Sequence, residues 1–152
     1  MLCRTDLTCR LATFAAILGL VQIFVGRAMA ADVFRGPVEA RVMRVIDGDT
    51  IAAEARLWPG HTLAVSVRLR GIDAPELRGK CAAERRAAIR ARAALTALIG
   101  HGSVSLSNIA GGKYYGRVLA DVAASDGRAL APLLLDRALV RPYRGRRRES
   151  WC

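Results

Sequence analysis

Five short segments with alternating hydrophobicity, interrupted by one long helical segment, most constrain how this chain can fold. Apolar and polar residues alternate, as in strands with one buried face, in five segments: residues 38–46, 50–57, 63–69, 103–108 and 118–123. Between the third and fourth segments, apolar residues recur at helical spacing from Ala82 to Ile99, and Gly100 follows as a stop signal. Pro132 introduces a second, short apolar helix at residues 133–139.

This order of elements favours a small closed β-barrel. In a parallel βαβ sheet, strands and helices would alternate throughout, whereas here three strands precede the first helix. The chain has 152 residues, of which 53% are hydrophobic. That is enough for one domain built around one core, and it excludes a disordered or fibrous protein.

The first thirty residues have the three parts of a secretory signal peptide. Two arginines precede an uncharged, mostly apolar run at residues 11–26, and Ala-Met-Ala at 28–30 is a small-x-small cleavage site. The run is shorter than the roughly 18 residues usually needed to span a bilayer, although an uncleaved signal anchor is the alternative. We expect residues 1–30 to be a signal peptide, 31–152 to form the domain, and the protein to be periplasmic or secreted.

The chain is strongly basic. It has 24 lysines and arginines against 13 aspartates and glutamates, a formal net charge of +11. This balance indicates a polyanionic or anionic-surface partner. Nucleic acid is one such partner, and the lipid or polysaccharide of a cell envelope is another.

Two of the four cysteines, Cys81 and Cys152, lie outside the predicted signal peptide. An exported chain with an even pair favours one disulfide, and we predict that these two pair; two free thiols are the alternative. The bond would pin the arginine-rich C-terminal tail, with its positive charge, at the start of the long helix, close in sequence to Glu76. His61 and His101 stand beside glycines and are typical of solvated turns, with metal ligation improbable.

Three short motifs contain the candidate functional residues. Residues 47–50 (DGDT) lie at a strand-to-strand turn and by themselves are typical of an ordinary turn. In residues 68–76 (RLRGIDAPE), Pro75 forces extended geometry on Ala74, so that its carbonyl and the flanking carboxylates can serve as hard oxygen ligands and a base; capping or pairing with arginine is the alternative. Residues 113–117 (KYYGR) place aromatic and cationic groups together, as base stacking and phosphate contact require, or else form a tight turn with exposed tyrosines.

The order and spacing of these motifs, from about residue 38 to residue 143, resemble the staphylococcal nuclease (thermonuclease) family. The resemblance implies an α+β, mainly β fold: a five-stranded OB-fold Greek-key barrel with a helix between strands three and four and a C-terminal helix. It also implies a Ca²⁺-dependent endonuclease that hydrolyses the phosphodiester bonds of DNA and RNA and leaves 3′-phosphate ends. We expect a monomer whose partners are DNA and RNA, with no stable membrane partner unless the signal is uncleaved.

Matching positions give each site residue an implied role. The roles are calcium binding by Asp49, Asp73 and the carbonyl of Ala74, catalysis by Arg68, Glu76 and Arg117, and substrate binding by Tyr115 and Lys113. Phosphodiester hydrolysis needs an oriented water and positive charge on a phosphorane that gains negative charge in the transition state. Glu76 would serve the water, as a general base or as a positioning group, while the two arginines would bind phosphate oxygens.

Three departures from the family pattern stand out. Only residues 77–80 separate Glu76 from Cys81, Lys113 replaces an acidic or neutral residue, and Ala138 occupies a site that is commonly Gly. The alternative function is a noncatalytic OB-fold nucleic-acid-binding protein. Such a protein would be expected to have lost one or more of the five charged site residues, all of which are present here.

Overall fold

The structure is a computed structural model that describes residues 32–152, so the predicted signal peptide at 1–30 lies outside the described residues. The elements follow in the order β1 (Val33–Phe34), β2 (Val38–Asp47), β3 (Thr50–Trp58), β4 (His61–Leu69), β5 (Ile72–Asp73), α2 (Ala82–Ile99), β6 (Ser103–Gly111), β7 (Arg117–Ala124), α3 (Leu130–Asp136) and β8 (Arg141–Pro142). Within this part of the chain, neither helix has the length and hydropathy of a membrane span.

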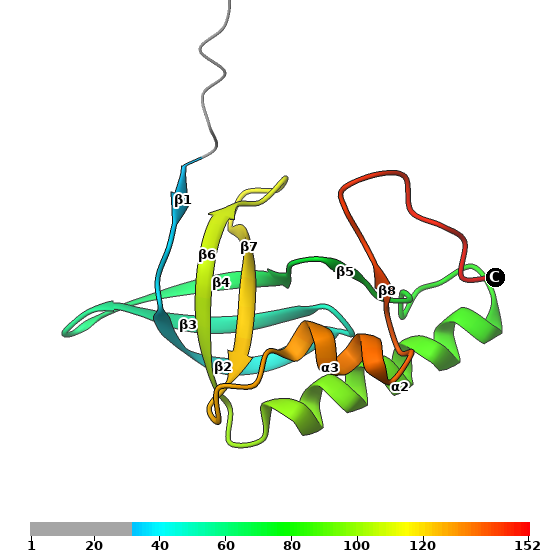
Figure 1. Cartoon of the computed structure of the whole chain (residues 1–152), viewed down its shortest axis with the longest axis horizontal. Helices are drawn as coiled ribbons and strands as arrows, with labels where there is room; N and C mark the ends of the chain where they lie inside the picture. Colours follow the sequence, from blue (N-terminus) through cyan, green and yellow to red (C-terminus); the bar gives the residue numbers. More distant parts are fainter. Residues whose placement is uncertain (1–31) are drawn as a thin grey trace, which may run out of the picture. The chain divides into compact units, whose positions relative to one another are not determined.

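Five long strands close into a barrel within residues 32–152 (Figure 1). Strand β2 pairs antiparallel with β3, and β3 with β4. Strand β4 then runs parallel to β7, β7 pairs antiparallel with β6, and β6 returns to β2. Helix α2 connects the third and fourth of these strands, and α3 follows the fifth. The predicted mainly β, OB-fold-like barrel with two helices is confirmed.

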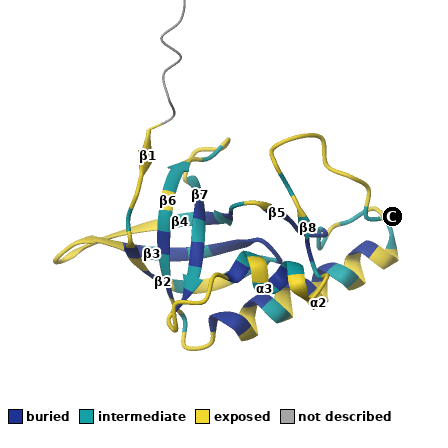
Figure 2. Ribbon diagram, in the orientation of Figure 1, coloured by how far each residue is buried: buried dark blue, intermediate teal, exposed yellow. Residues whose placement is uncertain are grey.

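The barrel interior is filled by the inward faces of the strands (Figure 2). Ile51, Val67 and Leu106 are fully or almost fully buried, and Leu130 and Leu134 of α3 close one end with no exposed surface. Burying an aliphatic side chain of this size contributes about 1.5–3 kcal/mol each. The loop after β8 is exposed along most of its length, in contrast to this core.

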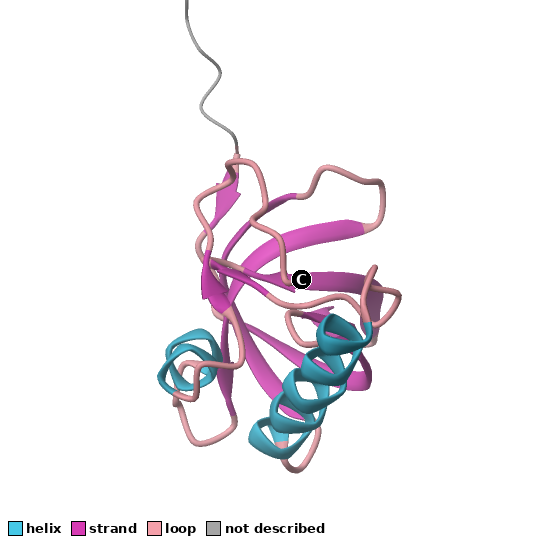
Figure 3. Cartoon of the chain, turned by 90° about the vertical axis from the view of Figure 1, so that its right-hand side faces the viewer, coloured by secondary structure: helices cyan, strands magenta, loops and turns pink. Residues whose placement is uncertain are grey.

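Helix α2 has the predicted bounds. Cys81 caps its start, where its Sγ accepts a hydrogen bond from the Glu84 amide at 3.4 Å, and Gly100 ends it with a φ of 61°. Such a φ lies in the left-handed region that favours glycine. Both α2 and α3 lie at the lower end of the barrel in Figures 1 and 3.

Alanine on α2 allows the β2–β3 turn to approach the helix closely. A Cβ built on Gly48 would lie 2.6 Å from the Cβ of Ala91 and 2.9 Å from the Cβ of Ala74. These distances are far shorter than van der Waals contact between carbons. Gly48 is therefore required by packing at the turn that carries Asp49, and not by turn geometry alone.

Two details differ from the sequence-based expectation. Helix α3 spans Leu130–Asp136 and not 133–139, because the fully buried Leu130 belongs to its first turn and Ala138, at a φ of 51°, leaves the helical conformation. His61 begins β4 where a turn residue was expected, since it pairs with Trp58 across the hairpin. Both His61 and His101 are exposed, as predicted.

Candidate active site

Arg68 joins the first two motifs at one guanidinium group. The β3–β4 register pairs Thr50 with Arg68, so the β2–β3 turn lies beside the end of β4. Arg68 donates from Nη1 to Asp49 Oδ1 at 2.5 Å and from Nη2 to Asp73 Oδ1 at 3.3 Å. Two carboxylates that are distant in sequence therefore share one cationic partner.

The carboxylate of Asp49 is only 2% exposed and is bonded through both oxygens. Besides Arg68, Oδ1 accepts from the Thr50 hydroxyl at 2.9 Å, and Oδ2 accepts from the amide of Ala74 at 2.8 Å. Burial raises the pKa of Asp49 to about 6, because the loss of hydration outweighs the opposing influence of Arg68. Asp49 thus links the turn, the end of β4 and the segment after β5.

Strand β5 and the residues after it provide the remaining oxygen groups. Asp73 is buried and pairs with Arg141 in the short β5–β8 ladder. Ala74 is also buried, and its small side chain lies close to Gly48. Its backbone carbonyl is a further oxygen acceptor in this segment. The carboxyl group of Glu76 is about half exposed, with 47% of its side-chain surface accessible.

Glu84 supports the short loop that follows Glu76, a role the sequence reasoning missed. Its buried carboxylate accepts from the amide of Glu76 at 3.3 Å and from the amide of Lys80 at 3.0 Å. A Cβ on Gly79 would lie 2.4 Å from the Cδ of Glu84, so the loop wraps closely around this carboxylate. The sequence did contain a sign of this role, because Glu84 stands three residues after the N-cap Cys81. From that position an acidic side chain can reach back and accept hydrogen bonds from the preceding amides.

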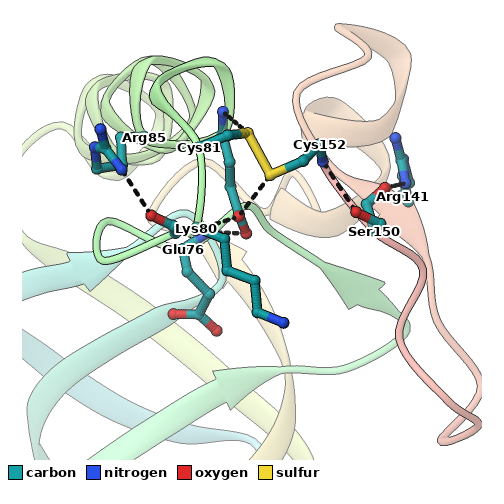
Figure 4. The surroundings of a disulfide bond; sticks show 9 residues. Glu76, Lys80, Cys81, Arg85, Arg141, Ser150 and Cys152 are labelled. Carbon is teal, nitrogen blue, oxygen red and sulfur yellow. Dashed lines mark hydrogen bonds between the residues drawn. A yellow bond between two sulfur atoms is a disulfide. The ribbon is translucent and has the colours of Figure 1, made fainter.

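The predicted disulfide is present. Cys81 and Cys152 are bonded with a Cα–Cα distance of 6.0 Å, which joins the start of α2 to the end of the chain (Figure 4). Trp151 donates from Nε1 to Asp73 Oδ2 at 3.2 Å, and the guanidinium of Arg141 lies 4.0 Å from the centre of the Trp151 ring. The tail is therefore pinned at the helix start, as predicted, and it also reaches Asp73.

Arg148 of this tail makes the contacts that the sequence reasoning did not anticipate. Its Nε lies 2.7 Å from Asp73 Oδ1, its Nη2 donates to the Ala74 carbonyl at 2.8 Å, and its Nη1 donates to Glu76 Oε1. The sequence placed Arg148 only in a polar, basic tail. No periodic pattern could have shown that the tail folds back onto these particular oxygens.

Arg117 of the third motif extends from the same face of the barrel as Arg68. Arg117 pairs with Ser66, two residues before Arg68 on the neighbouring strand. Its guanidinium lies 5.4 Å from the ring centre of Tyr114, and the Nζ of Lys113 lies 5.7 Å from the same ring. Tyr115 is fully exposed. Within residues 32–152, no hydrogen bond or ion pair joins the Arg117 side chain to an acidic residue.

The oxygen groups that lie together are the kind that Ca²⁺ prefers. Two buried aspartates, one backbone carbonyl and one glutamate supply only hard oxygen atoms. Positively charged groups, Arg68 and Arg148, already lie against these oxygens. The sulfur atoms of Cys81 and Cys152 lie near Glu84, but they are bonded to one another and so offer no thiolate to a metal.

The site contains three kinds of chemical group. Oxygen groups of the kind that suit a hard cation lie around Asp73, the carboxylate of Glu76 is accessible to water, and Arg68 and Arg117 supply guanidinium groups of the kind that bind anions. Comparison with models of known protein families and with curated proteins found no match for this chain.

Proposed function

We propose that this chain is an exported, Ca²⁺-dependent nuclease of the staphylococcal nuclease type that hydrolyses DNA and RNA and leaves 3′-phosphate ends. One observation carries the proposal. Arg68 bridges Asp49 and Asp73 beside the Ala74 carbonyl, and Glu76 follows in the same segment. These are the residues to which the resemblance assigns calcium binding and catalysis, and they come from two separate motifs on an OB-fold-like barrel.

The two arginines would bind the phosphate. Arg117 of β7 pairs with Ser66 of the adjacent strand β4, and Ser66 lies two residues before Arg68. Arg68 and Arg117 therefore extend from the same face of the sheet. A phosphodiester lying over this face would meet guanidinium donors from both strands as the phosphorane gains negative charge. Ion pairs with Asp49 and Asp73 hold Arg68 in one orientation before substrate binds.

Glu76 would act on the attacking water. Its carboxylate is accessible, while its backbone amide is fixed by the buried carboxylate of Glu84. Glu76 Oε can therefore accept a hydrogen bond from a water, or its proton, at a constant place in the site. Asp49, Asp73 and the Ala74 carbonyl would hold Ca²⁺, which when bound supplies Lewis-acid polarisation of a phosphate oxygen.

Substrate strands would be bound by the exposed β6–β7 turn and the tail. Lys113, Tyr114 and Tyr115 form an exposed group of cationic and aromatic side chains in the turn, which suits stacking on bases. A hollow of about 560 Å³ between Asp73 and the arginine-rich tail adds positive charge. The β6–β7 turn and this tail project on the same side of the barrel in Figure 1. The disulfide suits an oxidising compartment such as the periplasm or the exterior.

The test is cleavage of plasmid DNA and of RNA by residues 31–152, with Ca²⁺ or with excess chelator. We expect cleavage only with Ca²⁺, and DNA ends that a polymerase extends only after a phosphatase has removed the 3′-phosphate. Undiminished cleavage in chelator would contradict the calcium requirement. Binding of DNA without any cleavage would instead favour the noncatalytic nucleic-acid-binding protein.

Substitutions separate catalysis from binding. Arg68→Ala, Arg117→Ala and Glu76→Gln should each lower turnover by two or more orders of magnitude, about 3 kcal/mol for a lost transition-state interaction, while DNA binding survives. Arg92→Ala is the matched control, because Arg92 is an exposed arginine of α2 and its loss changes the net charge equally. Near wild-type turnover in all three variants would refute the assigned roles.

A further inference from the structure

The guanidinium of Arg148 occupies the oxygen groups to which the proposed function assigns the cation and the water. It contacts the Asp73 carboxylate, the Ala74 carbonyl and the Glu76 carboxylate at once. With Arg68 on Asp49 and Asp73, the three carboxylates already have positive partners within the protein. This tail is therefore part of the site and not a solvated extension of it.

A divalent cation and this guanidinium cannot use the same oxygens at the same time. Ca²⁺ needs lone pairs of Asp73 and the Ala74 carbonyl that now accept hydrogen bonds from Arg148. The two positive charges would also repel each other strongly at the few ångströms that such sharing implies. Binding of Ca²⁺ must consequently displace Arg148 from these groups, and it must also loosen the contacts of Arg68 with Oδ1 of Asp49 and of Asp73.

Several contacts keep Arg148 close to the oxygens. The disulfide fixes Cys152 to Cys81, so only three residues separate Arg148 from a covalent anchor at the start of α2 (Figure 4). The side chain of Trp151 donates a hydrogen bond to Asp73, and its ring stacks on the guanidinium of Arg141. Arg141 Nη1 also donates to the Ser150 carbonyl at 2.9 Å. An anchor of this kind raises the effective concentration of the guanidinium at the site.

We propose that Arg148 is a built-in competitor for the cation site: it neutralises Asp73 and Glu76 in the metal-free protein and leaves when Ca²⁺ binds. The Cys81–Cys152 bond keeps the competitor in reach and so sets the Ca²⁺ concentration at which the site fills. The inference rests on the proposed function, because it takes the oxygen groups around Asp73 to be the cation site. Its consequence is a lower apparent Ca²⁺ affinity than the oxygen groups alone would give. The apparent Kd equals the Kd of the unobstructed site divided by the fraction of molecules in which the tail is displaced.

Calorimetric titration of the folded domain with Ca²⁺ alone, without nucleic acid, tests the inference. Arg148→Gln removes the charge at a side chain that is 39% exposed, so it leaves the core intact. We expect it to lower the Kd for Ca²⁺ at least tenfold. Arg92→Gln is the matched control, because Arg92 is an exposed arginine of α2 and its loss changes the net charge equally; its Kd should equal that of the wild type.

A second variant tests the anchor. Replacing Cys81 and Cys152 together with serine keeps a good helix cap at position 81 and frees the tail. We expect a Kd between those of the wild type and Arg148→Gln. Thermal unfolding followed by circular dichroism checks that each variant is folded, and Asp73→Asn added to Arg148→Gln should weaken Ca²⁺ binding if the ion occupies this site.

The outcomes separate the two proposals. Equal Ca²⁺ affinity in the wild type and Arg148→Gln, or weaker affinity in the variant, would refute competition by Arg148 while leaving the cation site in place. The same change in Arg92→Gln would reduce the effect to net charge and refute it as well. An absence of Ca²⁺ binding in every folded variant would remove the cation site, and with it both proposals.

Discussion

Gly48→Ala should destabilise the protein and disturb the site at the same time. The added Cβ would lie 2.6 Å from Ala91 and 2.9 Å from Ala74, whereas carbon atoms in contact are about 3.5–4.0 Å apart. The turn and helix α2 would have to separate by roughly an ångström. Overpacking of this kind costs about 1–3 kcal/mol, so we expect the free energy of unfolding to fall by about 2 kcal/mol.

The assay is urea unfolding of residues 31–152 combined with a double-mutant cycle. Ala91→Gly alone should cost about 1 kcal/mol, since glycine is a poor residue inside a helix. Ala91→Gly also removes the Cβ that would clash with the new side chain at position 48. The double variant should therefore be at least about 1 kcal/mol more stable than the two single losses of stability, added together, would predict. Gly111→Ala is the control, because a Cβ there meets nothing within 4 Å.

Strict additivity of the two substitutions would refute the packing argument. A large loss of stability in Gly111→Ala would do the same, because it would show that alanine is harmful at glycines that have free space. Ca²⁺ titration of Gly48→Ala adds a functional measurement. The substitution pushes on Ala74, whose carbonyl belongs to the proposed cation site, so its Ca²⁺ affinity should fall along with its stability.

Three further substitutions test other parts of the structure. Ala138→Gly should raise the free energy of unfolding by about 0.5–1 kcal/mol, because Ala138 is exposed and holds a φ of 51° that glycine adopts without strain; lower stability in urea unfolding would contradict this. The pKa of Asp49 is raised to about 6, so the folded state binds its proton more tightly than the unfolded chain does. In chelator, the stability of the wild type relative to Asp49→Asn should therefore fall by about 2 kcal/mol as pH rises from about 4 to about 6, and a constant difference would refute the shift. Glu84→Gln should lower turnover more than DNA affinity, since Glu84 fixes the amide of Glu76; Glu54→Gln, on the exposed side of β3, should change neither.

The sequence was sufficient where local pattern and tertiary structure agree. Alternating hydrophobicity predicted the strands because each has one face in the barrel, and α2 has the predicted bounds because Cys81 and Gly100 cap it. The start of α3 was misplaced because Pro132 was taken as the residue that precedes the helix, whereas the buried Leu130 brings residues 130–132 into it.

The site was predictable in its motifs but not in its supporting contacts. The motifs identified Asp49, Arg68 and Asp73, which lie together in the structure. Glu84 and Arg148 were missed because neither belongs to a motif: one acts through the backbone of a neighbouring loop, the other through a tail that folds back from the end of the chain.

The disulfide described above also changes what proteolysis can do to this protein. The bond closes a covalent ring that runs from Cys81 to Cys152 and includes α2, β6, β7 and α3. The exposed β6–β7 turn, with Tyr115 at full exposure, is the kind of site that proteases cut first. A single cut there opens the ring without separating the two pieces, since the disulfide and the barrel hydrogen bonds still join them. A molecule nicked there would keep residues 116–152, and gels would show the break only after reduction.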